Sequence, residues 1–376
     1  MKNFFASLRG YLKQTDLTLL FLALITSFLG LVFIYSATRS YDTSKFIIVQ
    51  GGAIFIGIFA FIMASLIDFE NISRFWKVFF VFNLLFLASV FVLGEEGGTG
   101  NRSWIRFAGI GIQPAEFGKL IFIFTLSSHI NQLKERINSI WSVIQLCLHG
   151  LITTAFVYLF SKDLGMAVSY LFIFAAMIFV SGISLKWIFA FLGVGAAGSP
   201  LVWKFLSKNQ KDRILVILDP SINPARYYQT AQSKLALGAG QLYGSGFLQG
   251  RQTQFNKLPA KHTDSIFSVI GEEFGFIGCC VIMVLLALII LRIFRDSTKA
   301  GSNFGFLMCV GIGSMFMVQT IINIGLCVGL LPVIGLTLPF LSYGGSSIVT
   351  MFLAIGVVAS FVMRQRPSWL RSGGNE

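Results

Sequence analysis

Long apolar runs separated by short polar segments dominate this sequence of 376 residues. A helix that crosses a membrane needs about 20 mostly apolar residues, because that length spans roughly 30 Å of hydrocarbon, and it satisfies its own backbone hydrogen bonds. The sequence therefore predicts an all-α, polytopic integral membrane protein, a single membrane domain over residues 1–376. Its ten expected spans lie near residues 17–36, 46–66, 76–94, 113–130, 141–160, 164–182, 185–205, 265–292, 303–327 and 340–363.

The composition supports the membrane assignment. Hydrophobic residues make up 55% of the chain, and charged residues make up only 12%. A water-soluble domain usually carries about twice that charged fraction, which excludes a soluble enzyme. The net charge of +13 does not indicate a nucleic-acid partner, because most cations lie in short segments between apolar runs, where they set membrane topology. The five cysteines lie in or beside apolar runs and have neither metal-ligand nor disulfide spacing.

The lysines and arginines predict the orientation. The segments that hold Lys134 with Arg136 and Arg292 with Arg295 belong to the cation-rich side of the membrane, which is the cytoplasmic side. An even number of spans then places both termini in the cytoplasm. The long segment 206–263 is expected on the outer side, because loops of this length are translocated largely regardless of charge.

Two outer segments are more than simple connections. Residues 95–112 are rich in glycine and predict a turn-rich loop ahead of the fourth span. Within 206–263, the stretch YYQTAQSKLALGAGQL has Tyr228, Leu235 and Leu242 at roughly helical spacing, which predicts a helix lying along the membrane surface. A long loop with structure of its own usually carries function.

Cations gather in these outer segments and form a candidate anion-binding site. Arginine binds phosphate through two parallel hydrogen bonds, and lysine acts as a point charge, so the group suits a pyrophosphate or another anionic head group. The alternative is a general attraction to anionic lipids. The candidate residues are Arg102, Arg106, Lys211, Arg213, Arg226 and Lys234.

Three charged residues lie in or at the ends of predicted spans, where charges are costly unless paired or hydrated. Glu116 and Lys119 are three residues apart in the fourth span and can pair on one helical face, either as a structural ion pair or as part of a site. Asp163 begins the sixth span, where a carboxylate either caps the helix or serves a site.

The segment KHTDSIFSVIGEEFGFIG contains the strongest group of candidates, Asp264 with His262 and Thr263. Thr263 or Ser265 can cap the eighth span, which places Asp264 beside the first helical turn at the outer membrane surface. This position has opposing effects on the pKa of Asp264. A helix N-terminus lowers a carboxylate pKa, whereas desolvation raises it, and a general base works best with its pKa near the operating pH. The sequence leaves this balance open.

Further acids follow Asp264 along the same predicted helix. Asp264, Ser268 and Glu272 are expected on one helical face, and Glu272 with Glu273 lies about 12 Å deeper by helical rise. Two adjacent acids at that depth predict a hydrated cleft inside the protein.

Four segments, taken together and in this order, resemble the SEDS family of bacterial shape, elongation, division and sporulation proteins, which includes RodA and FtsW. With the ten-span frame, the resemblance extends over nearly the whole chain. The segments are NRSWIRFAGIGIQPAEFGKL (101–120), LDPSINPARYYQTAQSKLALGAGQLYGSG (218–246), LPAKHTDSIFSVIGEEFGFIG (258–278) and LPVIGLTLPFLSYGGSS (331–347).

The resemblance implies an inverting peptidoglycan glycosyltransferase in the bacterial cytoplasmic membrane, with an outward-facing active site. Such proteins polymerise lipid II beside a class B penicillin-binding protein. The family's catalytic aspartate corresponds to Asp264, which would take a proton from the acceptor sugar. A divalent cation, Mg²⁺ or Mn²⁺, is expected to bridge the pyrophosphate, although the chain shows no dedicated metal cage. The expected substrate-binding residues are Arg102, Arg106, Glu116, Lys119, Asp163, Lys211, Arg213, His262, Thr263 and Ser342.

The chain departs from the family pattern near the expected site. Ala260 stands where the family usually has glutamate, Ser265 where phenylalanine is common, and Lys162 where proline precedes the sixth-span aspartate. The segment TQFNKLP and the short tails resemble RodA more than FtsW, which predicts a role in cell elongation; the alternative is a division-specific polymerase. A lipid II flippase is a second alternative, but its key charges should lie near the membrane midplane, whereas Asp264 is expected at the outer surface.

Overall fold

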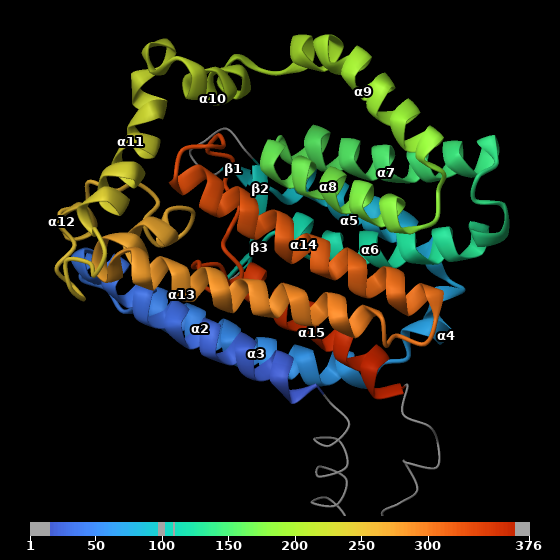
Figure 1. Ribbon diagram of the computed structural model, residues 1–376, viewed down its shortest axis with the longest axis horizontal. Coiled ribbons are helices and arrows are strands. Elements are labelled where there is room, and N and C mark those ends of the chain that lie inside the picture. Colours follow the sequence, from blue (N-terminus) through green and yellow to red (C-terminus); the bar gives the residue numbers. More distant parts are fainter. Residues whose placement is uncertain (1–15, 97–101, 108–109, 365–376) are drawn as a thin grey trace, which may run out of the picture.

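The computed structural model describes residues 16–96, 102–107 and 110–364, and most of these residues are helical. Each of the ten predicted spans corresponds to a helix (Figure 1). The helices are α2 (Leu17–Thr38), α3 (Lys45–Leu66), α5 (Trp76–Leu93), α6 (Pro114–Leu133), α7 (Ile140–Ser161), α8 (Leu164–Val180), α9 (Leu185–Phe205), α13 (Ile266–Ser297), α14 (Asn303–Cys327) and α15 (Gly345–Arg364). Short helices α4 (Phe69–Ser73), η1 (Arg39–Tyr41) and η2 (Lys134–Arg136) lie in the connections.

Within the described ranges, eight helices are long and apolar enough to cross a membrane. The other two of the ten are α8, which is apolar but has 17 residues, and α6, which carries the buried Glu116 and Lys119. The protein is therefore a polytopic helical membrane protein, as the sequence predicts. The start of α2 and the end of α15 lie at one end of the bundle, and α11 and α12 lie at the other (Figure 1).

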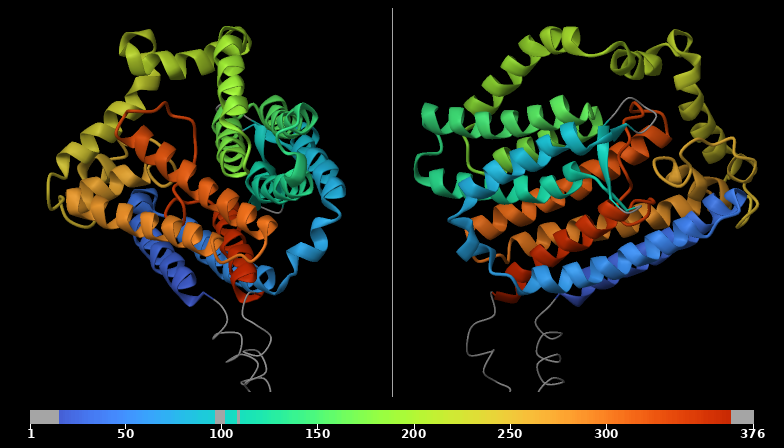
Figure 2. Two further views of the ribbon diagram at one scale, coloured as in Figure 1. Left: turned by 45° about the vertical axis from the view of Figure 1, so that its right-hand side comes forward. Right: turned by 180° about the vertical axis from the view of Figure 1, so that it is seen from behind.

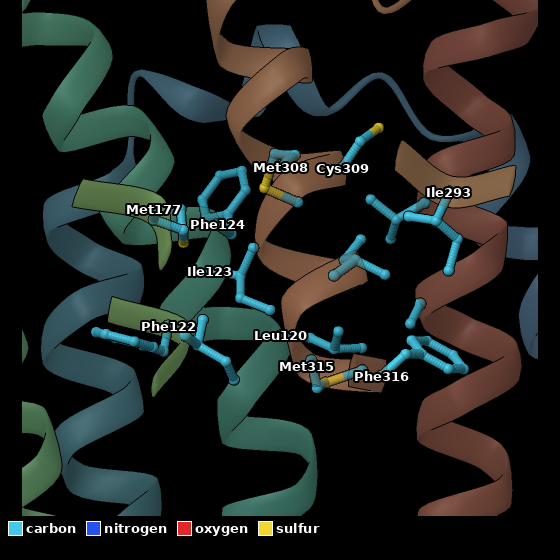
Figure 3. Close-up of a cluster of buried hydrophobic side chains, with 14 of the residues drawn as sticks. Leu120, Phe122, Ile123, Phe124, Met177, Ile293, Met308, Cys309, Met315 and Phe316 are labelled. Carbon is cyan, nitrogen blue, oxygen red and sulfur yellow. The ribbon is translucent and has the colours of Figure 1, made fainter. Parts of the chain in front are cut away.

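The core lies where α14 and α15 pack among the other helices. α15 packs along α3, while α14 packs against α13, α8 and α6. Side chains from three of these helices interlock, with Ile123 of α6 and Met177 of α8 close to Met308 of α14 (Figure 3). By contrast, α9 continues into α10 (Lys208–Leu218) and α11 (Pro224–Ala239), which together form an arch beside the bundle (Figure 2).

The segment before α6 adds a small sheet to the mostly helical fold. Instead of a turn-rich loop, it forms a small antiparallel sheet in the order β1-β2-β3. The strands are β1 (Glu95–Glu96), β2 (Arg102–Phe107) and β3 (Ile110–Ile112), and Ile105 pairs with Ile112. The local signal for β2 is the strand-favouring set Trp104, Ile105 and Phe107, but the glycines around it conceal this signal. The sheet leads directly into the first turn of α6.

The outer segment 206–263 is structured, as predicted. The expected helix over YYQTAQSKLALGAGQL is α11, displaced toward the N-terminus because Pro224 is favourable at a first helical position. The segment also contains η3 (Pro220–Ile222) and α12 (Arg251–Gln254). That α11 lies along the membrane surface stays a prediction.

Two predicted spans need correction. The last one begins at Gly345 rather than near residue 340, because residues 331–344 form an irregular segment in which Phe340 has a φ of 62°. The eighth is broken at Gly275, whose φ is 67° and ψ is −164°. The freed backbone N–H groups of Phe276 and Ile277 donate to the carbonyls of Gln241 and Leu242, so the inserted 240–246 loop accounts for the break.

Candidate active site

Asp264 lies in a tight turn that ends at the N-terminus of α13. The backbone N–H groups of Thr263 and Ser265 donate to the carbonyl of Ala260, over 3.1 and 3.0 Å. Ala260 has a φ of 48°, and Ser265 is the N-cap residue, although its side chain does not cap the helix. Asp264 thus lies beside the first turn, as predicted, but before the helix. The expected helical face shared by Asp264, Ser268 and Glu272 is therefore wrong.

A cavity of about 540 Å³ opens beside this turn. It lies between β2, the starts of α6 and α8, the helices α10 and α11, the Asp264 turn and the segment 332–337. Its lining residues include three acids that are far apart in the sequence, Glu116, Asp163 and Asp264, together with Arg213 of α10. The fold thus brings together four of the predicted site residues, and Thr263 lines the same cavity.

Asp163 caps α8, which is one of the two functions that its sequence position allowed. Its Oδ1 accepts a hydrogen bond of 3.1 Å from the backbone N–H of Met166, which caps α8. Its Oδ2 accepts a hydrogen bond of 3.4 Å from the hydroxyl of Ser103 in β2. The carboxylate also lines the cavity, and burial raises its pKa above the usual range.

The structure settles the balance of effects on Asp264. Burial is the largest effect, the charge of Asp163 adds to it, and the guanidinium of Arg213 opposes both; together they raise the pKa of Asp264 to about 7. Desolvation thus decides the direction in which this pKa shifts. A carboxylate with this pKa can hold a proton and release it near neutral pH, as a general base requires.

Glu116 and Lys119 form the ion pair that their spacing predicts. Lys119 Nζ lies 2.8 Å from Glu116 Oε2, and both side chains are almost completely buried. Only Glu116 lines the cavity; Lys119 lies deeper in α6. The ion pair therefore extends from the cavity wall into the interior of the helix bundle.

Most of the other predicted cations lie elsewhere. Arg106 is exposed on β2 and lies 3.6 Å from Glu95, and Lys211 is not among the residues that line the cavity. The side chains of Arg102 and Arg226 lie outside the part of the chain that the structure describes. Arg213 is consequently the one lining cation among the residues that the structure describes.

His262 and Ser342 lie behind the cavity wall rather than in it, so their contact with substrate stays a prediction. The His262 ring packs against Phe46 and Tyr343, with ring centroids 4.8 and 5.6 Å apart. The buried Ser342 hydroxyl donates to the carbonyl of Thr263 over 2.7 Å and accepts a hydrogen bond of 2.8 Å from Leu338 N–H.

Glu272 and Glu273 do not line the predicted hydrated cleft. The Glu272 carboxylate accepts hydrogen bonds from the backbone N–H groups of Gln252 and Thr253 and from the Thr253 hydroxyl, which fixes the start of α12. Glu273 accepts hydrogen bonds from Ser36 and Gln254. These acids are satisfied by the inserted outer segment, whose position the sequence does not reveal.

Several residues that line the cavity were not predicted from the sequence. Trp104 of β2 and Gln113 before α6 lie in the cavity wall, as do Tyr228 and Gln229 of α11 and Tyr343. A signal existed for Trp104 and Gln113, because both lie within residues 101–120, the first of the segments that resemble the SEDS family. Among the described residues, no group of three His, Cys, Asp or Glu side chains fits a metal ion. The expectation of Mg²⁺ or Mn²⁺ thus stays a prediction, and no catalytic step is assigned to a metal.

Comparison with known proteins gives a consistent picture. The sequence profile of FtsW, RodA and SpoVE, described as cell cycle proteins, matches residues 16–366. A probable peptidoglycan glycosyltransferase FtsW of Trichlorobacter lovleyi is 33% identical over 92% of this chain and 93% of its own length. Stage V sporulation protein E of Bacillus subtilis is 35% identical over 91% of this chain and 95% of its own.

Solved structures share the fold. One, described as coordinating polymerization and crosslinking in a peptidoglycan synthase complex, has a TM-score of 0.78 and 27% identity, covering 93% of this chain and 98% of that chain. The rod shape determining protein RodA of Thermus thermophilus has a TM-score of 0.70 and 26% identity, covering 94% of this chain and 97% of its own.

Proposed function

We propose that this chain, which belongs to the FtsW, RodA and SpoVE family of cell cycle proteins, acts as a peptidoglycan glycosyltransferase. It polymerises lipid II in the cavity beside Asp264, and Asp264 is the general base. The observation that carries this proposal is the convergence of Asp264, Asp163, Glu116 and Arg213 on one cavity. A lipid-linked substrate can reach such a site sideways, while its polyprenyl tail stays in the hydrocarbon.

The reaction joins two sugars by a single displacement. Asp264 accepts the proton of the 4-hydroxyl of the acceptor GlcNAc, and the hydroxyl oxygen attacks the anomeric carbon of the donor. The bond from that carbon to the donor pyrophosphate breaks with inversion, and the lipid pyrophosphate leaves with the electron pair. Arg213 faces the same cavity and stabilises the charge that develops on the leaving group.

The assay is glycan-strand formation from purified lipid II by the protein with its partner, a class B penicillin-binding protein. We infer this partner from the similarity to a peptidoglycan synthase complex. The protein acts in the bacterial cytoplasmic membrane, and we propose that both termini are cytoplasmic and that the cavity faces outward. The assignment of Asp264 fails if Asp264→Asn polymerises as fast as the wild type.

The pH dependence of turnover gives an independent test. A general base must be deprotonated, and the pKa of Asp264 is about 7, so kcat/KM is expected to rise as the pH increases through 7. Asp163→Asn removes a negative charge that raises this pKa, and it keeps an oxygen able to cap α8. The rise should therefore move to lower pH, by about one unit. A pH profile that is the same in both proteins would contradict the proposed coupling.

Within the family, we propose a role in elongation rather than division. The RodA-like segment before the Asp264 turn and the RodA fold of a solved relative support this role, whereas the similarity to FtsW and stage V sporulation proteins supports the alternative. The chain, expressed with its own class B partner, is expected to restore rod shape to cells depleted of their elongation polymerase. Rescue of filamenting cells depleted of their division polymerase instead would overturn the role, and Asp264→Asn is the inactive control.

A flippase is the competing class of function, and the broken α13 is the feature that favours it, because transporters bind substrates at interrupted helices. The break at Gly275 is, however, filled by the 240–246 loop. None of the described cavity-lining residues comes from α13. The interruption and the cavity are thus separate, which favours the polymerase.

A further inference from the structure

The turn that carries Asp264 is held from behind by α14. Asn323 of α14 is completely buried, and its amide group donates two hydrogen bonds. One, of 3.0 Å, goes to the backbone carbonyl of Asp264, and the other, of 2.7 Å, goes to the backbone carbonyl of Leu336. A single side chain thus connects two segments that are about 70 residues apart in the sequence.

Both of these segments form walls of the cavity. Thr263 and Asp264 line one side, and residues 332–335 with Thr337 line another. The two walls approach closely, since a Cβ atom on Gly335 would lie 3.7 Å from Asp264 Oδ2. Any movement of one wall against the other would therefore change the position of the Asp264 carboxylate within the cavity.

The chemistry of Asn323 indicates more than packing. An amide buried in a helical core costs free energy unless it forms hydrogen bonds, and an apolar side chain would fill the same space without that cost. Within the described part of the chain, Asn323 Oδ1 has no hydrogen-bond partner. The two N–H donors are consequently the interactions that favour asparagine at this position.

We propose that Asn323 is a positioning residue that ties the Asp264 turn to the 332–337 segment and so fixes the Asp264 carboxylate in the cavity. Ser342 supplies a second tie one residue earlier, through its hydrogen bond to the carbonyl of Thr263. Loss of Asn323 alone should therefore loosen the turn without releasing it. The effect on turnover rests on the proposed function of Asp264; the effect on the position of the carboxylate does not.

The kinetic test compares Asn323→Leu with Gln319→Leu. Gln319 lies four residues earlier in α14, is equally buried, and forms no hydrogen bond through its side-chain amide among the described residues. Asn323→Leu is expected to lower kcat about tenfold or more, because small displacements of a catalytic group are costly, with little change in KM. Gln319→Leu should retain kcat, and Asn323→Gln, which keeps both donors, should retain more than Asn323→Leu.

A second readout does not depend on catalysis. Dicyclohexylcarbodiimide modifies protonated carboxyl groups, and mass spectrometry of peptides separates Asp264 from Asp163 and Glu116. Among the described residues, these two are the other acids that line the cavity, and Arg213 is the cation that lines it. In the wild type, labelling of Asp264 should fall as the pH passes through about 7. Burial is the main cause of that pKa, so a loosened, better hydrated turn in Asn323→Leu should move the midpoint to lower pH.

The outcomes distinguish the positioning function of Asn323 from the general-base function of Asp264. A shift of the pH midpoint of Asp264 labelling in Asn323→Leu, but not in Gln319→Leu, supports the positioning function of Asn323. This conclusion stands even if Asp264→Asn proves active and the general-base assignment fails. An unchanged midpoint in a folded Asn323→Leu protein overturns the positioning function. If Asn323→Leu does not fold, the same comparison is made with Asn323→Ala, which removes both donors and adds no bulk; an unchanged midpoint there also counts against the proposal.

Discussion

Asp264→Asn is expected to lower the rate of glycan-strand formation by about 100- to 10,000-fold, the range that general bases contribute. The substitution preserves the size of the side chain but removes its ability to take a proton from the acceptor hydroxyl. Folding should be unaffected, because the turn is held through the carbonyls of Thr263 and Asp264, which remain. Binding of lipid II should also persist, because Arg213 and the other lining residues are unchanged.

The measurement is the initial rate of polymerisation at pH 8, where the wild-type carboxylate is ionised, with thermal melting of each protein as the folding control. Asp219→Asn is the matched control. That carboxylate also lies in the outer segment, where it accepts hydrogen bonds from Ser221, but it does not line the cavity. Equal losses in the two variants would point to a general effect of the substitution and remove the special status of Asp264.

The sequence predicts the fold well wherever hydrophobic length decides the structure. All ten spans correspond to helices, because the bilayer imposes a minimum apolar length that the sequence displays directly. It fails where backbone partners come from distant segments. The break at Gly275 depends on the 240–246 loop, and the irregular segment before Gly345 depends on ties to Thr263 and His262. Neither of these long-range interactions leaves a recognisable sequence pattern at Gly275 or in the segment before Gly345.

The same distinction applies to the site. Asp264, Asp163 and Glu116 are conspicuous in the sequence because acids are costly near hydrocarbon, and the structure brings all three to one cavity. Glu272 is equally conspicuous but caps α12 instead. Asn323 is inconspicuous, because the amides of the Gly-rich helix α14, which also holds Asn303 and Gln319, have no distinctive spacing. Charge thus indicates which residues need a hydrogen-bonding or ionic partner, whereas only the folded structure shows which groups are those partners.

Glu116→Gln is expected to destabilise the protein by about 3–5 kcal/mol, the usual effect of removing one partner from a buried ion pair. Lys119 has no exposed surface, and the substitution would leave its ammonium group without a counter-ion. Lys119→Met should cost a similar amount, because the Glu116 carboxylate oxygens are also buried and would lose their counter-ion. The double variant Glu116→Gln/Lys119→Met should recover much of the loss, since no unpaired charge then remains buried.

Unfolding of the four proteins in a denaturing detergent series measures these differences as a double-mutant cycle. The cycle also decides between the two functions that the sequence allows for the pair. A structural ion pair predicts a large favourable coupling energy, with polymerisation by the double variant restored along with its stability. A substrate-binding pair predicts single variants that are as stable as the wild type yet inactive, with no rescue in the double variant. The near-complete burial of both groups and their separation of 2.8 Å favour the structural result, with Glu116 holding the start of α6 at the cavity wall.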